Sequence, residues 1–239
     1  MVMEVNGRTN KPAAGTSGVK MKKVAPILAA AIVFLTGCSS LDLSTTTTTT
    51  VAKAVTVVNG YTIEPYANLM RAGLYRENLS GENLKGADLT RADLTGTILY
   101  NSNLSGTKLT DAYLTYANLS YADLSNANLS WANAEYVRLP NANLTKAVLM
   151  QMSLSYADLS NANLTGATLF GSNLTQANLS GANLTGANLE DADLLDANLT
   201  NANLTGANLK GARLELADLR GATMPDGWVE GNWQSPQDN

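Results

Sequence analysis

The sequence predicts an all-β solenoid, in which the chain winds into successive coils around a leucine core. Two observations predict it. From Leu69 to Met224 every fifth residue is leucine, except Ala134 and Met224 itself, and the register never slips. Two residues before each of these positions stands a small side chain, usually alanine and otherwise mostly serine or threonine. We therefore expect two residues in every five to face inward.

A period of five excludes the two common alternatives. In an α-helix, leucines five apart rotate by about 140° from one to the next, so the apolar stripe would wind round the helix and bury against nothing. The intervening glycines and threonines are also poor helix formers. In an extended strand, successive leucines would point to opposite faces. A chain that turns a corner every five residues keeps all of them inside.

The repeating unit resembles that of a known family. Units such as residues 87–91 (ADLTR) and 202–206 (ANLTG) resemble the pentapeptide repeat, whose pattern is A-(D/N)-L-x-x. The segments 61–65 and 224–227 resemble the ends of bacterial members. The resemblance covers about two-thirds of the chain. It implies a right-handed quadrilateral β-helix with four pentapeptides per coil, hence about eight coils, with the leucine and the small residue inside.

A coil of 20 residues places residues 20 apart in one column, about 4.8 Å apart along the axis. Opposite charges follow this spacing, as stacking requires, in the pairs Asp88 and Lys108, Arg138 and Asp158, Glu190 and Lys210, and Asp193 and Arg213. Another column is asparagine apart from one aspartate: Asn83, Asn103, Asp123, Asn143, Asn163, Asn183 and Asn203. We expect its amides to donate to one coil and accept from the next.

Residues 1–37 are predicted to be an N-terminal extension and a lipoprotein signal peptide. Residues 1–20 have no periodicity, and we interpret them as unstructured or as an artefact upstream of a start at Met21. Lys22 and Lys23 then precede an apolar h-region, residues 24–35, which is too short to span a bilayer.

The end of this apolar segment resembles a bacterial lipobox, formed by Leu35, Thr36, Gly37 and Cys38. The resemblance implies cleavage before Cys38 and acylation of its sulfur and its amine. More than one acyl chain gives stable membrane anchoring. The predicted location is the cell envelope, at the outer membrane if the cell is Gram-negative. The alternative is an ordinary secretory segment with a chance cysteine.

Residues 38–55 are predicted to be a lipid-anchored, threonine-rich linker, because they have low complexity and no apolar periodicity. Residues 56–228 are predicted to be the β-helix with its end caps, and residues 229–239 a C-terminal tail. Residues 56–66 would cover the first coil, since a solenoid end exposes core leucines and unpaired edges. Trp228 and Trp233 would form a lid at the other end or a homodimer contact.

Three places depart from the repeat. Glu77 and Glu82 occupy inward positions in the first coil, which we therefore expect to be distorted or open to water. Ala134 replaces a core leucine, and one coil later Met152 replaces a small residue, so the methionine is expected to fill the gap. Val137 and Pro140, in the coil of Ala134, predict a bulge or a broken corner there.

The composition argues against several classes of function. The chain has no histidine and one cysteine, which excludes internal disulfides and Cys/His metal sites. No nucleophile–base pair can be named, so we predict no enzyme activity, no cofactor and no metal. The net charge of −4 argues against nucleic-acid binding. An acidic cluster at residues 190–196 would attract a cation or, as we prefer, form ion pairs with the next coil.

Outward aromatic residues form the candidate interaction patch. Tyr116, Tyr136 and Tyr156 fall in one column at a corner, and Trp131, Met150 and Phe170 are predicted to lie on the adjoining face. Stacked tyrosines can simply support one another. Alternatively, the patch binds a partner protein or a glycan, since contiguous exposed apolar surface is uncommon.

These observations predict a lipid-anchored, non-enzymatic rod of the bacterial envelope that has a structural or protein-binding role. The alternative is glycan or cell-wall binding through the aromatic patch. Members of the pentapeptide-repeat family that mimic DNA and bind gyrase offer a third hypothesis. It fits this chain less well, because outward acidic residues are largely balanced by lysine and arginine and the lipobox implies export.

Overall fold

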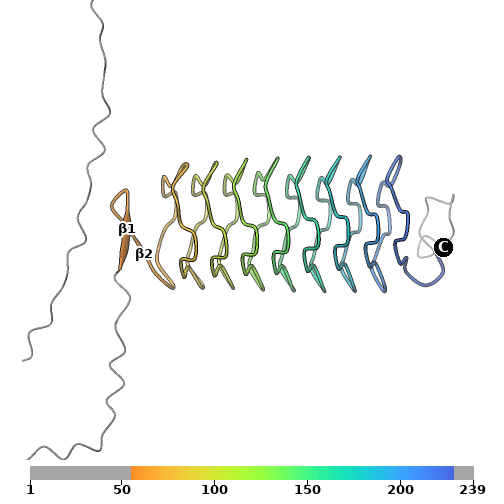
Figure 1. The fold of residues 1–239 in the computed structure, drawn as a ribbon, viewed down its shortest axis with the longest axis horizontal. Coiled ribbons are helices and arrows are strands. Elements are labelled where there is room, and N and C mark those ends of the chain that lie inside the picture. Colours follow the sequence, from red (N-terminus) through yellow and green to blue (C-terminus); the bar gives the residue numbers. More distant parts are fainter. Residues whose placement is uncertain (1–54, 229–239) are drawn as a thin grey trace, which may run out of the picture. The chain divides into compact units, whose positions relative to one another are not determined.

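The computed structural model describes residues 55–228, which form a short hairpin followed by a four-sided β-helix (Figure 1). Each coil lies parallel on the next, and residue n pairs with residue n+20, from Asn68 with Asp88 to Asn203 with Thr223. The column that begins at Asn68 contains eight residues, so the rod has eight coils. The predicted coil of 20 residues is therefore confirmed.

Backbone hydrogen bonds explain why five residues make one side of the coil. The N–H groups of Leu144 and Lys146 donate to the following coil at 2.7 and 2.9 Å. The N–H of Ala147 turns back to the Leu144 carbonyl at 3.0 Å and so closes the corner. The second residue after each leucine takes a left-handed backbone, with φ of 56° at Lys146. The corner thus recurs every five residues and the leucine returns to the inside each time.

Where asparagine precedes a leucine, its side chain acts mainly within its own coil. The side-chain oxygen of Asn163 accepts hydrogen bonds from the N–H of Thr165 at 3.1 Å and from its hydroxyl at 2.6 Å. In the asparagine column, the one amide bond between described coils runs from Asn143 to Asp123, at 2.9 Å. The predicted amide ladder is therefore confirmed only in part, because this turn already engages the oxygen.

Two of the predicted charge pairs are ion pairs. Lys108 lies 3.5 Å from Asp88, and Arg213 lies 2.8 Å from Asp193. Desolvation opposes ionisation of Asp88, but hydrogen bonds from Thr90, together with Lys108, lower the pKa of its carboxyl. In the two other columns the carboxylates accept hydrogen bonds from asparagine amides instead, at Asp158 and Glu190.

Inward leucines and small residues fill the rod, and nearly all are fully buried. Four buried hydroxyls replace alanine at the small position. Each of them donates to a backbone carbonyl at 2.6–2.8 Å: Thr97, Ser102, Thr107 and Ser172. Among residues 55–228 no buried side-chain polar atom lacks a partner. The core is therefore apolar and its few polar groups cost little.

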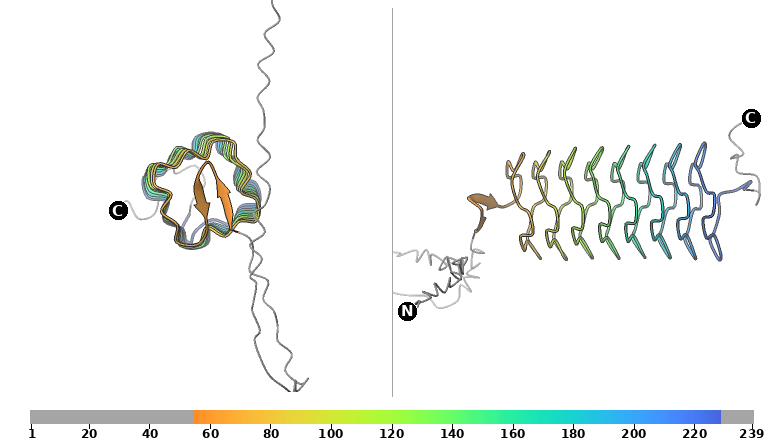
Figure 2. Two further views of the ribbon diagram at one scale, coloured as in Figure 1. Left: turned by 90° about the vertical axis from the view of Figure 1, so that its left-hand side faces the viewer. Right: turned by 90° about the horizontal axis from the view of Figure 1, so that it is seen from above.

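The hairpin of β1 (Thr56–Val58) and β2 (Tyr61–Ile63) lies across the open end of the first coil, where the sequence predicts a cap (Figure 2). It also provides hydrogen bonds to two inward carboxylates. Thr56 donates to Glu82 at 2.9 Å, and the amide of Asn59 donates to Glu77 at 3.0 Å. Of the two expectations for this coil, distortion is wrong, because its backbone pairs regularly with the next coil, whereas partial access to water agrees with the half-buried state of both carboxylates.

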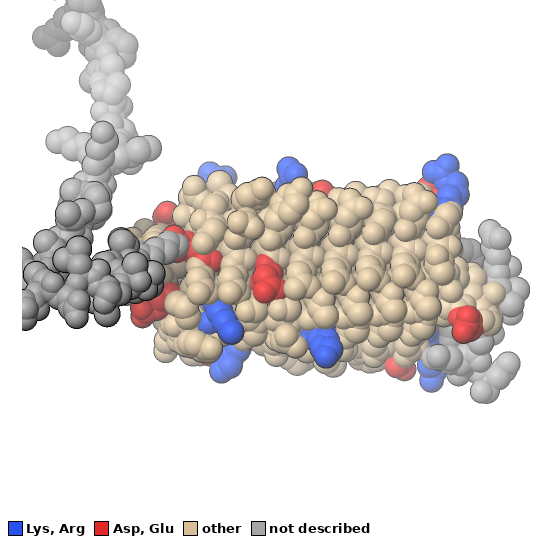
Figure 3. Space-filling view, turned by 60° about the horizontal axis from the view of Figure 1, so that its bottom comes forward, with Lys and Arg blue, Asp and Glu red and all other residues tan. Residues whose placement is uncertain are grey.

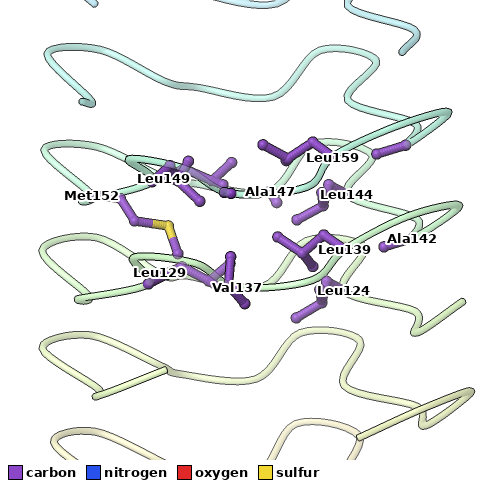
Figure 4. Close-up of a cluster of buried hydrophobic side chains, with 14 of the residues drawn as sticks. Leu124, Leu129, Val137, Leu139, Ala142, Leu144, Ala147, Leu149, Met152 and Leu159 are labelled. Carbon is purple, nitrogen blue, oxygen red and sulfur yellow. The ribbon is translucent and has the colours of Figure 1, made fainter. Parts of the chain in front are cut away.

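The irregular central coils also keep a regular backbone. Ala134 and Met152 are both buried, and the Met152 thioether extends toward the coil of Leu129 and Val137 (Figure 4). That coil also carries Ala134. The predicted bulge is wrong, because Arg138 pairs with Asp158 as in any other coil. Proline fits at position 140 because the residue after each leucine donates no backbone hydrogen bond to another coil.

At the C-terminal end Trp228 is half-buried and packs against the core, and its backbone N–H donates to the Pro225 carbonyl at 3.1 Å. This contact agrees with a lid, while a homodimer through Trp228 and Trp233 stays a prediction. Trp233 and the tail lie outside the described residues. So do residues 1–54, with the signal peptide, the lipobox, Cys38 and nearly all of the linker.

Candidate interaction face

One corner of the rod carries the predicted tyrosine column. The rings of Tyr116 and Tyr136 stack with centroids 5.1 Å apart and an interplanar angle of 17°. Those of Tyr136 and Tyr156 lie 4.8 Å apart at 4°. Because the ring faces cover one another along the axis, the column directs mainly ring edges and hydroxyl groups outward.

Trp131, Met150 and Phe170 occupy the neighbouring corner. The backbone N–H of Trp131 donates to the backbone carbonyl of Met150 at 3.0 Å, and the backbone N–H of Gln151 donates to that of Phe170 at 2.9 Å. The three apolar residues therefore stand one per coil in three consecutive coils. The expectation that they lie on a flat face is corrected, because each belongs to the two-residue turn after a leucine. Trp131 is 59% exposed, whereas Met150 and Phe170 are half-buried.

Between the two corners runs a column of small polar residues, Asn133, Ser153 and Asn173, which pair coil to coil. Three consecutive coils thus repeat one arrangement, with an apolar residue, then an amide or hydroxyl, then a tyrosine or glutamine. We call these nine residues the aromatic strip: Trp131, Asn133, Tyr136, Met150, Ser153, Tyr156, Phe170, Asn173 and Gln176. Tyr113 and Tyr116 extend it by one coil.

The predicted patch did not include the polar column or Tyr113, because all of its residues follow a core position, whereas the column and Tyr113 immediately precede one. Tyr113 is 54% exposed and lies 20 residues before Asn133. The signal was present in the repeat. Residues that precede a leucine point outward, so the column between two aromatic corners could have been read from the spacing alone.

Four aromatic corner residues of the strip and its extension occupy costly backbone positions. Tyr116, Trp131, Tyr136 and Tyr156 all have φ between 57° and 61°. Glycine adopts this left-handed conformation freely, whereas it costs other residues roughly 1–2 kcal/mol. Stacking offsets this cost for the tyrosines. Trp131 has no aromatic partner among residues 55–228, so its exposed indole lacks this support, although its backbone is held by the same hydrogen bonds as every other corner.

All four polar side chains of the strip form hydrogen bonds within the protein, and those of Asn133 and Ser153 involve the neighbouring residue Glu135. The side-chain oxygen of Asn133 accepts from the Thr115 hydroxyl at 3.1 Å and from the Glu135 N–H at 3.3 Å. Its amide nitrogen donates to no protein atom in the described part of the chain. The Ser153 hydroxyl donates to Glu135 at 3.3 Å. Asn133 therefore offers N–H groups outward.

The phenol of Tyr136 is harder to ionise than an ordinary tyrosine. Loss of hydration between its neighbours raises its pKa, and Tyr156, Tyr116 and Glu135 raise it further because each adds negative charge when ionised. The folded state thus binds this proton more tightly than the unfolded chain. The resulting stabilisation is complete below pH about 10 and is lost as the pH rises above that value.

We expect a titration of tyrosinate absorbance to contain a late component that Tyr136→Phe removes. Replacing both Tyr116 and Tyr156 by alanine should move that component to lower pH, since it rehydrates the phenol and removes two neighbouring charges. An unchanged late component in the double variant would contradict the stacked arrangement.

The acidic cluster at residues 190–196 is largely engaged by the protein itself. Asp193 pairs with Arg213 at 2.8 Å, and Asp196 accepts from the Gln176 amide at 2.7 Å. Glu190 accepts from the Asn208 amide at 3.3 Å. These bonds favour pairing along the columns over cation binding.

Comparisons with known proteins agree with this architecture. The family model of pentapeptide repeats matches in eight copies over residues 67–221. HetL, a pentapeptide repeat protein involved in heterocyst differentiation regulation from the cyanobacterium Nostoc sp. strain PCC 7120, is 36% identical. The match covers 69% of this chain and 84% of HetL, with a TM-score of 0.34. AT2G44920 from the Arabidopsis thaliana thylakoid lumen is also 36% identical, over 40% of this chain and 63% of that protein, with a TM-score of 0.32.

QnrB1, a plasmid-mediated fluoroquinolone resistance protein, is 22% identical over 67% of this chain and 87% of QnrB1, with a TM-score of 0.34. No curated protein matches the sequence. The predicted right-handed quadrilateral β-helix is confirmed by the family match together with the eight stacked coils. Because the matched repeats span well over half of the 239 residues, this chain belongs to the pentapeptide-repeat family.

Proposed function

We propose that this protein is a lipid-anchored, non-enzymatic rod of the bacterial cell envelope that binds a partner through the aromatic strip. The observation that carries the binding role is Trp131, which is 59% exposed in a strained backbone position without a ring partner. Every corner shares this backbone, so it is the large exposed apolar surface of Trp131, next to Met150 and Phe170, that makes it a candidate for binding. The lipobox resemblance at Leu35–Cys38 carries the location.

The chemistry of the rod supports a binding role over catalysis. The chain has no histidine to activate its many hydroxyls. Several outward hydroxyls, such as those of Thr145 and Thr185, donate to the asparagine two residues earlier. Family membership favours structural or protein-binding roles. Residues 55–228 include no helix with the length and apolar character needed to cross a bilayer.

DNA mimicry is a weaker proposal for this rod. It would need a dense field of negative charge, whereas residues 55–228 contain 10 basic residues beside 16 acidic ones. Figure 3 shows side chains of both signs scattered over one face of the rod, with wide uncharged areas between them. The similarity to QnrB1 concerns the fold alone.

The test of the envelope proposal is intact mass and cell fractionation of the protein expressed from Met21 in a bacterial host. We expect a mass increment for acyl chains on Cys38 and recovery in the membrane fraction. The Cys38→Ala variant should lose both the increment and the membrane association. Unmodified wild-type protein in the cytoplasm would refute the anchor and make cytoplasmic partners, gyrase included, the first to test.

A further inference from the structure

We propose that the aromatic strip binds a neutral, unbranched polysaccharide strand that lies along the rod axis with one sugar ring per coil. The inference deepens the proposed function by naming its ligand class. Binding itself depends on the strip alone, so it does not require that Cys38 is acylated.

The first argument is the repeat of the strip. Its tyrosine rings succeed one another at 5.1 and 4.8 Å, and its polar column pairs residue for residue between coils. In an extended 1,4-linked polysaccharide, each pyranose ring advances the strand by close to one such step. Each ring of a strand along the axis would therefore lie opposite one set of groups, one apolar and two polar. Alternate rings of a β-1,4-linked strand are turned over, so they would offer their C–H faces to every coil and their two polar edges in turn.

The second argument is chemical complementarity. A pyranose ring presents C–H groups on its faces and hydroxyl groups around its edge. Exposed indole, such as Trp131, can pack against the C–H groups, and Met150 and Phe170 continue this apolar row. The amide of Asn133 retains N–H donors for a sugar hydroxyl or acetamido oxygen. The stacked tyrosines contribute phenol hydroxyls rather than ring faces, because their faces cover one another.

The third argument separates a glycan from a protein partner. Protein interfaces concentrate their binding energy in well-packed apolar centres surrounded by a polar rim. Here polar groups run down the middle of the strip, between two rows of larger side chains. None of the nine side chains of the strip carries a charge. A neutral ligand with many hydroxyls, and with polar groups in every unit, fits this pattern better.

The probe is a series of β-1,4-linked N-acetylglucosamine oligomers, from dimer to hexamer. They are titrated calorimetrically into the full chain carrying Cys38→Ser, which keeps the protein free of lipid. We expect saturable binding whose affinity rises with each added ring up to three or four rings, the number of coils that the strip spans, and then levels off. Trp131→Gly should weaken hexamer binding by at least about tenfold, and Asn133→Ala by several fold.

Tyr121→Gly is the matched control. Tyr121 is a corner residue with φ of 60° and 54% exposure, but it lies outside the strip and contacts Tyr100. Glycine suits both corner positions, so both variants should fold, which circular dichroism and urea unfolding would verify. Tyr121→Gly should bind the hexamer like the parent protein.

Three outcomes would overturn the proposal: no binding of any oligomer by the parent protein, equal losses in the two glycine variants, or an affinity that does not depend on oligomer length. Loss of an envelope protein from Trp131→Gly without any glycan binding by the parent would identify a protein ligand instead. Cytoplasmic, unmodified protein that still binds the oligomers would refute the envelope proposal and leave this one intact.

Discussion

Deletion of residues 161–180 is expected to leave a shorter rod that folds, whereas deletion of Gly166 alone is expected to disrupt the fold more than any single core substitution. Removing a whole coil joins Ser160 to Gly181 and keeps each later residue in its column, because pairing follows n and n+20. A protein that lacks residues 161–165 should also fold, because the deletion keeps the period of five and each later leucine still faces the core. That deletion would shift the outward columns by one side of the square.

The single deletion acts differently because it breaks the period of five. Gly166 occupies the left-handed corner position, with φ of 64°, and its N–H donates to the Thr185 carbonyl. Without it, either the corner is lost or the following residues change sides, so that polar groups face the core. A shift of one residue reverses inward and outward positions in any β structure with one buried face.

Far-UV circular dichroism and urea unfolding measure the outcome. The coil deletion should keep a cooperative transition with an m-value smaller by about one eighth, since m scales with the surface exposed on unfolding. The Gly166 deletion should lose the cooperative transition or shift its midpoint far to lower urea. Equal behaviour of the one-residue and 20-residue deletions would show that the five-residue register does not control folding.

The repeat made most of the fold predictable, because every residue in a coil has partners at fixed spacings. The inward leucines follow from counting, the coil of 20 residues follows from the resemblance to the pentapeptide repeat, and the ion pair of Asp193 with Arg213 follows from that coil length. The repeat could not predict the interactions that its residues make with segments outside it. The hydrogen bonds of Thr56 and Asn59 that satisfy Glu82 and Glu77 come from a hairpin with no repeat of its own.

Competition between local and longer-range bonds also limited the sequence argument. The sequence predicts that the Asn163 amide forms hydrogen bonds with the asparagines above and below it. In the structure its side-chain oxygen instead accepts from the backbone N–H and the hydroxyl of Thr165. Pro140 was expected to break a corner, yet it falls where no backbone donor is needed between coils. For the candidate site, the spacing of 20 residues predicted the tyrosine column. The strip depends in addition on the position of Trp131, which lies at a corner and not on a face.

The second large effect concerns Ala134 and Met152, two core positions that depart from the repeat. Met152→Ala is expected to lower the free energy of unfolding by about 2–5 kcal/mol, because it leaves a cavity in the part of the core where Ala134 already replaces a leucine. Ala134→Leu alone should also destabilise, by about 1–3 kcal/mol, since the methionine already extends toward that coil. Urea unfolding of the single variants would measure both values.

The double variant Ala134→Leu with Met152→Ala restores the regular repeat and should be close to the parent in stability. The two changes would then be strongly non-additive, as expected for residues that share one space in the core. Met152→Ala combined with Leu204→Ala is the control, because residue 204 lies more than two coils further along the rod and the two costs should add. Additive losses in the first pair would mean that the methionine does not compensate for the missing leucine, and that the rod tolerates Ala134 by another rearrangement of its core.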